Sequence, residues 1–291
     1  MFKLYAKPRM APFPHHLLPS SSVKLCVISV LLCVPFLLIG CRPKPVPPPT
    51  PIPPPQTDIV QIGVAGSATA VTPLVTSANP QAQFITGSTD TLLDDLENGR
   101  LDAILIHHLP ADLPNYFNPV ALDGLVIVVH PALPIGGLSR ADIQAIFNGR
   151  IQNWSAVGGP DLPITLISRE AASGTRALFV QHIMAAQRIS INALIQPDDV
   201  SLRTAVADTP GAVGYSMMGN SQTGEVKVLA VDGRLPTPTT TADQSYPLTA
   251  PLYFVSADTS EPTGALRSLL AWMQSDVGQE ALTGGGYGRV R

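Results

Sequence analysis

Arg169 and the small polar residues that follow it have the types and the order of an anion-binding loop. The apolar run 164–167 predicts a buried strand, Arg169 follows it, and Ser173, Gly174 and Thr175 stand where a helical pattern begins. Ser173 is a favourable N-cap, and Gly174 lets a ligand approach the backbone amides at the positive end of the helix dipole. A guanidinium adds a planar fork of donors that matches an oxyanion. The spacing alone fits an ordinary capped helix with a solvated arginine equally well.

The chain that must position these residues alternates apolar strand patterns with helical ones, which predicts an α/β fold with a doubly wound parallel sheet. Strands are expected at residues 59–64, 83–86, 102–106, 125–129, 164–167, 211–216, 226–231 and 252–256. Helices are expected from the Thr72 cap to before Pro80, from Asp90 to Asn98, after the Ser139 cap, after Ser173, near 199–206, and at 261–274 and 276–282.

Two more turns carry small hydroxyl residues at the end of a predicted strand. The turn 66–69 follows the first strand, and Gly87 and Ser88 follow the second. In open α/β sheets, ligands bind in the crevice outside the carboxyl ends of the strands. These turns are therefore expected to face the Ser173–Thr175 turn across a cleft, which favours the anion-binding interpretation of Arg169.

The first 57 residues have the pattern of an export and anchoring segment. Basic residues precede an apolar run at 25–39 with no acidic residue before it, which is typical of a signal peptide over residues 1–40. Residues 38–41 end in Cys41 and resemble a bacterial lipobox, so Cys41 is expected to carry a lipid; a plain N-terminal anchor helix is the alternative. Residues 41–57 are a Pro-rich linker, favoured as a spacer over a mucin-like stalk or a proline ligand. The body is thus expected on the outer face of a cell membrane.

Composition excludes several functions for the body. All three cysteines, Cys26, Cys33 and Cys41, precede residue 42, so the body has no disulfide, reactive thiol or thiolate metal ligand. The whole chain has 18 Lys and Arg against 21 Asp and Glu, and four of the basic residues lie before Gly40. A body this acidic argues against nucleic acid as a partner, and an anion must be held by local donors.

A set of motifs stands in a fixed order along the body. They are the turn 66–69 before Pro73, Gly87-Ser88, residues 122–131, residues 138–154, residues 168–176, residues 211–215, residues 246–248 and residues 278–287. Together they resemble the periplasmic phosphate-binding proteins of ABC transporters, a branch of the type II solute-binding family, over nearly all of residues 58–291. The resemblance implies a type II periplasmic-binding-protein fold: two lobes with open doubly wound sheets joined by two crossover strands. Residues 58–130 and 249–291 would form lobe 1, and residues 131–248 would form lobe 2.

The resemblance also implies the ligand contacts. Carried over position by position, these are Thr69, Ala70, Ser88, Arg169, Ser173, Gly174 and Thr175, with Ser67 as the alternative in the first turn. Some members accept the proton of hydrogen phosphate with a buried carboxylate just after the third strand, and His107 stands there instead. A neutral imidazole could accept that proton, whereas a charged one would attract any anion. The alternative is that His107 and His108 are two surface histidines at a strand end.

One further departure concerns the loop after Arg169. Ala171 and Ala172 replace more polar or glycine-containing family residues, which leaves Glu170 as the nearby partner for Arg169. The function implied is capture of phosphate or a related inorganic oxyanion between the lobes, by a lipid-anchored monomer that delivers it to an ABC permease without a metal or cofactor. The alternative is an oxyanion-sensing or adhesion protein with the same fold. An enzyme is not expected, because the sequence has no well-placed general base, no metal cluster and no Gly-x-Ser-x-Gly elbow.

Overall fold

Residues 59–290 are the part of the chain that the structure, a computed structural model, describes. The predicted signal peptide of residues 1–40, the lipidation site Cys41 and the Pro-rich linker 41–57 lie outside the described residues. Among the described residues, no helix combines the length and apolar character needed to cross a membrane.

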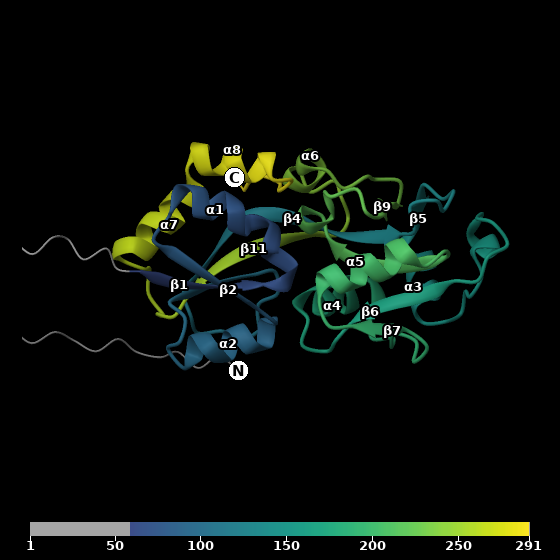
Figure 1. The fold of residues 1–291 in the computed structure, drawn as a ribbon, viewed down its shortest axis with the longest axis horizontal. Coiled ribbons are helices and arrows are strands. Elements are labelled where there is room, and N and C mark those ends of the chain that lie inside the picture. The colour runs from purple at the N-terminus through teal and green to yellow at the C-terminus, as the bar shows by residue number, and fades with distance from the viewer. Residues whose placement is uncertain (1–58, 291) are drawn as a thin grey trace, which may run out of the picture. The chain divides into compact units, whose positions relative to one another are not determined.

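Nine of the described strands form one hydrogen-bonded sheet whose order differs from the chain order (Figure 1). The order is β2-β1-β3-β11-β4-β8-β6-β7, with β9 paired to β4, and β10 and β5 pair separately. The bounds are β1 Val60–Ala65, β2 Ala82–Gly87, β3 Ala103–Ile106, β4 Phe117–Val129, β5 Gly137–Leu138, β6 Thr165–Arg169, β7 Leu194–Gln196, β8 Ala212–Met217, β9 Lys227–Val228, β10 Ala230–Val231 and β11 Thr249–Ser256.

The long strand β4 joins the two groups of strands. Its first part pairs antiparallel with β11, and residues 125–129 pair antiparallel with β8. The expected strand at 125–129 is therefore only the end of a thirteen-residue strand. The expectation of a parallel sheet holds for β1 with β2 and β3 and for β6 with β7 and β8, but it is wrong for β4 and β11, which run against their neighbours.

Six of the eight α-helices among the described residues begin behind a side-chain cap, whereas the first and the seventh have none. The bounds are α1 Thr72–Ala78, α2 Thr89–Glu97, α3 Arg140–Phe147, α4 Gly174–Phe179, α5 Asp199–Asp208, α6 Pro238–Ala242, α7 Gly264–Gln274 and α8 Asp276–Gly284. Single turns lie at η1 Gly66–Val71, η2 Trp154–Val157 and η4 Gly219–Ser221, and the π-helical η3 Val180–Met184 continues α4. The predicted cap Ser139 accepts the amide of Asp142 at 3.1 Å. Helix α7 begins at Gly264 rather than at the expected Glu261, because Pro262 disfavours helical geometry at Glu261 and Thr263 is an N-cap with extended backbone angles.

Residues of β3 alternate between two apolar layers. Ala103 and Leu105 pack in the cluster that contains Val75 of α1, whereas Ile104 and Ile106 pack in the cluster that contains Leu92 of α2. Successive side chains of a strand point to opposite faces, so α1 and α2 cover opposite faces of the sheet, as Figure 1 shows. We call these two clusters, with the residues of β11, α7 and α8 that they include, the first core.

A second core lies around the other end of the sheet. Leu125, Ile127 and Val129 of β4 pack with helices α3 and α4, and Val126 and Val128 pack with α5. Phe179 stacks on Tyr215 with ring centroids 4.1 Å apart and an interplanar angle of 8°. Each core has its own set of helices, and the division into two lobes with boundaries at residues 130 and 248 stays a prediction.

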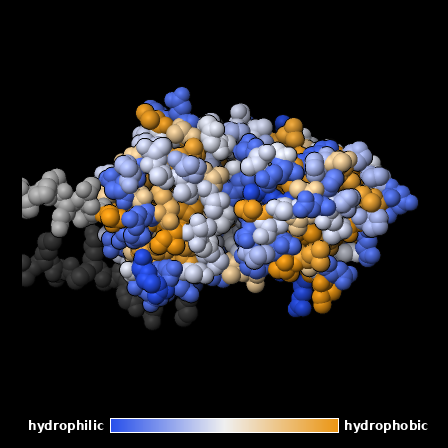
Figure 2. Space-filling model, viewed as in Figure 1, coloured by the Kyte–Doolittle hydropathy of each residue, from blue (hydrophilic) through white to orange (hydrophobic). Residues whose placement is uncertain are grey.

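The surface has no single dominant apolar region on the face drawn in Figure 2, where hydrophobic residues form several patches with polar residues between them. Ile191, Leu194 and Ile195 are among the exposed apolar side chains, and the last two belong to the short edge strand β7. Exposed apolar residues scattered in this way are ordinary for a folded protein.

Candidate functional site

Arg169 ends β6 with its side chain inside the molecule. Its Nε and Nη2 donate to the carboxylate of Glu170 at 2.9 and 3.0 Å, and its Nη1 lies 3.6 Å from Asp199 Oδ1. Only 3% of the residue is exposed, and Nη1 has no hydrogen-bond partner among the described residues. Glu170 thus orients the guanidinium from one side. The N–H groups of Nη1 donate no hydrogen bond within the described residues and are free to donate to a ligand.

The turn after Arg169 has the predicted cap. Ser173 Oγ accepts the backbone amide of Arg176 at 3.2 Å and starts α4. Thr175 is fully buried, and its Oγ1 has no partner among the described residues. The Arg176 side chain folds back and donates to the carbonyl oxygen of Arg169 at 2.5 Å. This contact ties the turn to the end of β6, so Arg169 and Thr175 are held at fixed places.

The second predicted turn lies against this one. Ser88 caps α2 and accepts the amide of Thr91 at 3.2 Å. The next residue, Thr89, is buried with its Oγ1 unpartnered, and a Cβ atom added at Gly174 would stand 2.5 Å from that oxygen. Thr89 was missed from the sequence, although it neighbours the predicted Ser88. The structure therefore brings the Ser88 and Ser173 turns into direct contact through Thr89 and Gly174, where the sequence led us to expect a cleft between them.

The first predicted turn, η1, is bound to a residue that sequence reasoning missed. Asn220, in η4, accepts the Thr69 hydroxyl at 3.2 Å and the Ala70 amide at 3.0 Å. Its Nδ2 donates to the Gly66 carbonyl at 2.9 Å and to Asp199 Oδ2 at 3.0 Å. The donors of Thr69 and Ala70 thus meet an amide oxygen in this structure. No sequence signal singled out Asn220, because its partners lie about 150 positions away.

The first turn also reaches the arginine. A Cβ atom added at Gly66 would lie 4.0 Å from Arg169 Nη2. The next residue, Ser67, is 4% exposed, and its Oγ lies 3.1 Å from His107 Nδ1. The turn η1, which packs in the first core, therefore lies beside the Arg169 guanidinium. Arg169 itself is carried by β6, which packs in the second core.

His107 is not the surface histidine of the alternative interpretation. It is 2% exposed, and its Nε2 lies 3.2 Å from Asp123 Oδ2, with both side chains fully buried. The surface interpretation is wrong for His107 because β3 ends against η1, and Asp123 of β4, which β11 separates from β3 in the sheet, supplies a polar partner. His108 is only half-buried, and partial burial lowers its pKa, against an opposing effect from Asp90.

Asp199 joins several charged groups behind Arg169. Arg203 Nη1 donates to its Oδ2 at 2.5 Å, and Ser216 Oγ lies 3.1 and 2.9 Å from its two oxygens. Burial raises the pKa of Asp199 above the ordinary carboxyl range, and Arg203, Asn220, Ser216 and Arg169 oppose that shift. Asp199 therefore holds Arg169, Arg203 and Asn220 around one buried carboxyl group.

The arrangement has spare donors rather than a metal-ligand set. Thr89 Oγ1, Thr175 Oγ1 and Arg169 Nη1 are all buried and all lack a hydrogen-bond partner in the described part of the chain. Leaving a buried polar group unpaired costs roughly 1–3 kcal/mol, so three such donors near contacting turns indicate a ligand that accepts hydrogen bonds. Within residues 59–290, no group of three His, Cys, Asp or Glu side chains could hold a metal ion.

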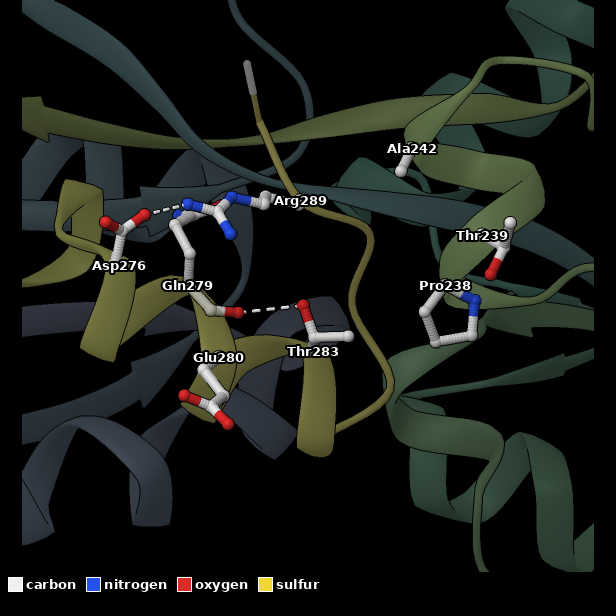
Figure 3. A pocket seen from close by; sticks show the side chains of 8 residues that line it. All are labelled: Pro238, Thr239, Ala242, Asp276, Gln279, Glu280, Thr283 and Arg289. Atoms are coloured by element: carbon white, nitrogen blue, oxygen red, sulfur yellow. Dashed lines mark hydrogen bonds and ion pairs between the residues drawn. The ribbon is translucent and has the colours of Figure 1, made fainter.

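The pocket drawn in Figure 3 is separate from these turns. It has a volume of about 450 Å³ and lies between α6 and α8. Its lining residues are Pro238, Thr239, Ala242, Asp276, Gln279, Glu280, Thr283 and Arg289. Arg289 pairs with Asp276 on the α8 side of it, and none of the sequence-predicted site residues lines it. The spare donors, not this pocket, therefore define the candidate site.

Comparisons with known proteins show which family the chain resembles. Residues 55–277 match the family model described as the PBP superfamily domain. A curated relative, the phosphate-binding protein PstS of Bacillus subtilis (strain 168), is 29% identical over 80% of this chain and 71% of its own length. PstS of Borreliella burgdorferi is 27% identical over 57% of this chain and 63% of its own length.

Two solved structures share the fold. One, from Clostridium perfringens, is described as a phosphate ABC transporter substrate-binding protein with bound phosphate; its TM-score is 0.70 at 22% identity, over 79% of this chain and all of that one. The other is an ABC-type phosphate transport receptor from Vibrio cholerae, with a TM-score of 0.62 at 25% identity over 78% of this chain and 99% of that one.

Proposed function

We propose, from the premise that this chain belongs to the PBP superfamily, that it binds phosphate or a closely related oxyanion outside the cytoplasm and delivers it to an ABC transporter. The relatives in the comparisons are named as phosphate-binding or phosphate-transport proteins, and none is named as an enzyme. The family and the fold limit the protein to ligand capture, and the choice of ligand rests on the site.

The observation that carries this proposal is the set of buried donors without partners. Arg169 Nη1, Thr89 Oγ1 and Thr175 Oγ1 come from separate segments, and the turn of Thr89 contacts that of Thr175. An oxyanion accepts several hydrogen bonds at once and carries the charge that Arg169 complements. Glu170 and Asp199 already pair with the guanidinium, and its Nη1 still has a hydrogen bond to give to a ligand oxygen.

The remaining predicted contacts fit the same ligand. The amides of Gly174 and Thr175 start α4 behind the Ser173 cap, where backbone donors favour negative charge. The donors of Thr69 and Ala70 currently bind Asn220 Oδ1, an oxygen acceptor of the kind that an anion would also offer. We therefore assign Thr69, Ala70, Ser88, Arg169, Ser173, Gly174 and Thr175 to the ligand-binding turns, with Thr89 added.

Isothermal titration of the purified protein with phosphate, arsenate, sulfate and tungstate tests the proposal. Saturable binding of phosphate that Arg169→Ala removes is the expected result. An absence of binding heat with all four anions, for a protein that circular dichroism shows to be folded, rejects it.

The proposal extends to the cellular setting. Residues 1–40 as a signal peptide, Cys41 as a lipidated N-terminus and residues 41–57 as a spacer would hold the binding body close to a membrane permease. A neighbouring pair of permease and ATPase genes favours transport, whereas a neighbouring sensor kinase gene favours the sensing alternative.

A further inference from the structure

Asn220 links two parts of the protein that pack in different cores. The turn that carries it, η4, follows β8 and begins after Met218, which packs in the second core. The turn that it contacts, η1, packs in the first core through Ala68 and Val71. Only 6% of Asn220 is exposed, so its side chain must find its hydrogen-bond partners within the protein.

All four hydrogen-bonding positions of this carboxamide are used. Its Oδ1 accepts the Thr69 hydroxyl at 3.2 Å and the Ala70 amide at 3.0 Å. Its Nδ2 donates to the Gly66 carbonyl at 2.9 Å and to Asp199 Oδ2 at 3.0 Å. The Ala70 amide can only donate and the Gly66 carbonyl can only accept, which fixes the orientation of the side chain. Asn220 therefore has no hydrogen bond left to give to a ligand.

The inner end of this link reaches the guanidinium of the candidate site. Asp199 Oδ2 accepts from Asn220, while Asp199 Oδ1 lies 3.6 Å from Arg169 Nη1. At the outer end, a Cβ atom added at Gly66 would lie 4.0 Å from Arg169 Nη2. The first turn and the guanidinium thus lie side by side, and Asn220 and Asp199 connect them through two hydrogen bonds and an ion pair.

The turn that carries Asn220 is itself held in place. The Gly219 amide donates to Asp123 Oδ1 at 3.1 Å. A Cβ atom added at Gly219 would lie 2.7 Å from Cζ of Tyr287, a fully buried side chain of the first core. Because η4 is fixed by a hydrogen bond and by close packing, Asn220 meets the first turn at a set position.

We propose that Asn220 is a positioning residue of the anion site, which fastens the first turn to the carboxyl group of Asp199 and so keeps that turn beside Arg169. This inference rests on the proposed function of the same site. A turn that is held in place before the ligand arrives does not have to be ordered on binding, which favours affinity. Asn220 carries no charge, so it governs the rate at which the anion leaves rather than the rate at which it arrives.

Asn220→Ala is expected to raise the dissociation rate of phosphate by about tenfold, because unpaired buried polar groups cost roughly a decade of affinity or more. The association rate should stay at its native value. Exchange of bound with free phosphate, followed by ³¹P NMR, measures dissociation, and isothermal titration measures the affinity and the stoichiometry. Asn192→Ala, at an exposed asparagine, is the matched control and should behave like the native protein.

These readouts distinguish positioning from a loss of stability alone. Partial unfolding lowers the fraction of molecules that bind, which isothermal titration reports as a reduced stoichiometry. The molecules that remain folded would still release phosphate at the native rate. Faster release at full stoichiometry is therefore the result expected only if Asn220 positions the site.

Asn220→Asp tests the donor side of the link. One oxygen of the carboxyl group can still accept from Thr69 and Ala70, whereas the other, when ionised, has no proton for Gly66 or Asp199. At pH 8 this variant is therefore expected to release phosphate about tenfold faster than the native protein, as Asn220→Ala does.

Lowering the pH is expected to restore the link in Asn220→Asp. Burial raises the pKa of Asp199, while Arg203 and Arg169, the charged groups that face it, oppose the shift. A second carboxylate beside Asp199 raises the pKa of the pair further, and the shared proton supplies the missing donor. The dissociation rate of this variant, relative to the native rate at the same pH, should fall from pH 8 to pH 5. An equal ratio at both pH values overturns the inference.

The outcomes separate this inference from the proposed function. If the native protein binds none of phosphate, arsenate, sulfate and tungstate, the proposed function fails and the inference falls with it. If it binds phosphate and Asn220→Ala releases the anion at the native rate, the function stands and the inference is overturned. Slower release would show that Asn220 competes with the anion for Thr69 and Ala70, which also overturns it.

A further measurement needs only the native protein and applies even if neither variant folds. Both Nδ2 protons of Asn220 are donated within the interior, so their exchange with water should be slow with and without phosphate. Nitrogen NMR with ¹⁵N-labelled asparagine measures this exchange, and proximity to the Ala70 amide assigns the signals. Exchange in the phosphate complex as fast as that of the exposed Asn192 overturns the inference.

Discussion

Thr89 Oγ1 lies directly against the Cα of Gly174, so close that a Cβ atom at Gly174 would stand 2.5 Å from it. This contact joins the start of α2 in the first core to the start of α4 in the second. Two helix starts from different parts of the chain can approach this closely only because residue 174 has no side chain.

Gly174→Ala is expected to weaken phosphate binding by about ten- to a hundredfold, because overpacking of this size costs roughly 1–3 kcal/mol and would push the two turns apart. Isothermal titration measures the loss. Gly136→Ala is the control, since an added Cβ there meets no atom within 4 Å. Equal affinities for the two variants would show that contact between the turns is not needed for binding.

Arg169→Ala is expected to abolish detectable phosphate binding. The substitution removes the charged donor assigned to the ligand, and a neutral methyl group cannot complement the charge of an oxyanion. The surface arginine Arg140, which pairs with Asp232, supplies the control Arg140→Ala. If Arg169→Ala still bound phosphate with micromolar affinity, the guanidinium would not be part of the binding site.

Asn220→Ala is expected to lower the free energy of unfolding even without ligand. Its side chain makes four hydrogen bonds, to Thr69, Ala70, Gly66 and Asp199, and leaving such buried partners unpaired costs roughly 1–3 kcal/mol each at most sites. Urea unfolding followed by circular dichroism measures the change. The exposed Asn192→Ala should unfold like the native protein, and a similar result for Asn220→Ala would contradict the linking role.

Asp198→Ala tests a pH-dependent helix cap. Asp198 accepts the Ser201 amide at 2.7 Å, and this bond, foremost, lowers its pKa below the ordinary value of 3.8. A carboxyl with a lowered folded-state pKa stabilises the protein above its unfolded pKa and loses that contribution as the pH falls through the folded one. Loss of the cap should cost about 0.5–2 kcal/mol near pH 7.

The cost of Asp198→Ala should shrink as the pH drops below 3.8, and urea unfolding at a series of pH values measures it. Asp198→Asn keeps a side-chain oxygen for the cap, so its stability should lack this pH dependence. A cost for Asp198→Ala that is constant from pH 7 to pH 3 would show that the ionised carboxylate is not what caps α5.

Cys41→Ala is expected to move the protein from the membrane fraction to the soluble extracytoplasmic fraction when the chain is expressed in bacteria, and to stop incorporation of labelled palmitate. Cys33→Ala, within the apolar run, is the control and should leave both unchanged. Persistent membrane association with no labelled lipid in either protein would favour the plain anchor helix.

Local patterns were enough to predict most elements. The Ser139 cap, the apolar residues of α3 and the strand–turn–helix units around Ser88 and Ser173 appear where the sequence indicated, because caps and periodic apolar residues act over a few positions. The expected strand at 226–231 is instead two short strands, and α6 lies in a region expected to be a loop. Both depend on neighbours that local patterns do not specify.

The sequence by itself determined the α/β class, the order of the turns and the residue types that can hold an anion. It could not pair residues far apart in the chain: Asn220 with Ala70, Thr89 with Gly174, or Asp123 with His107. Those pairs decide which donors stay unused. They arise only when the long strand β4 and the returning β11 bring the two cores together, because burial leaves each polar group to pair with whatever the fold sets beside it.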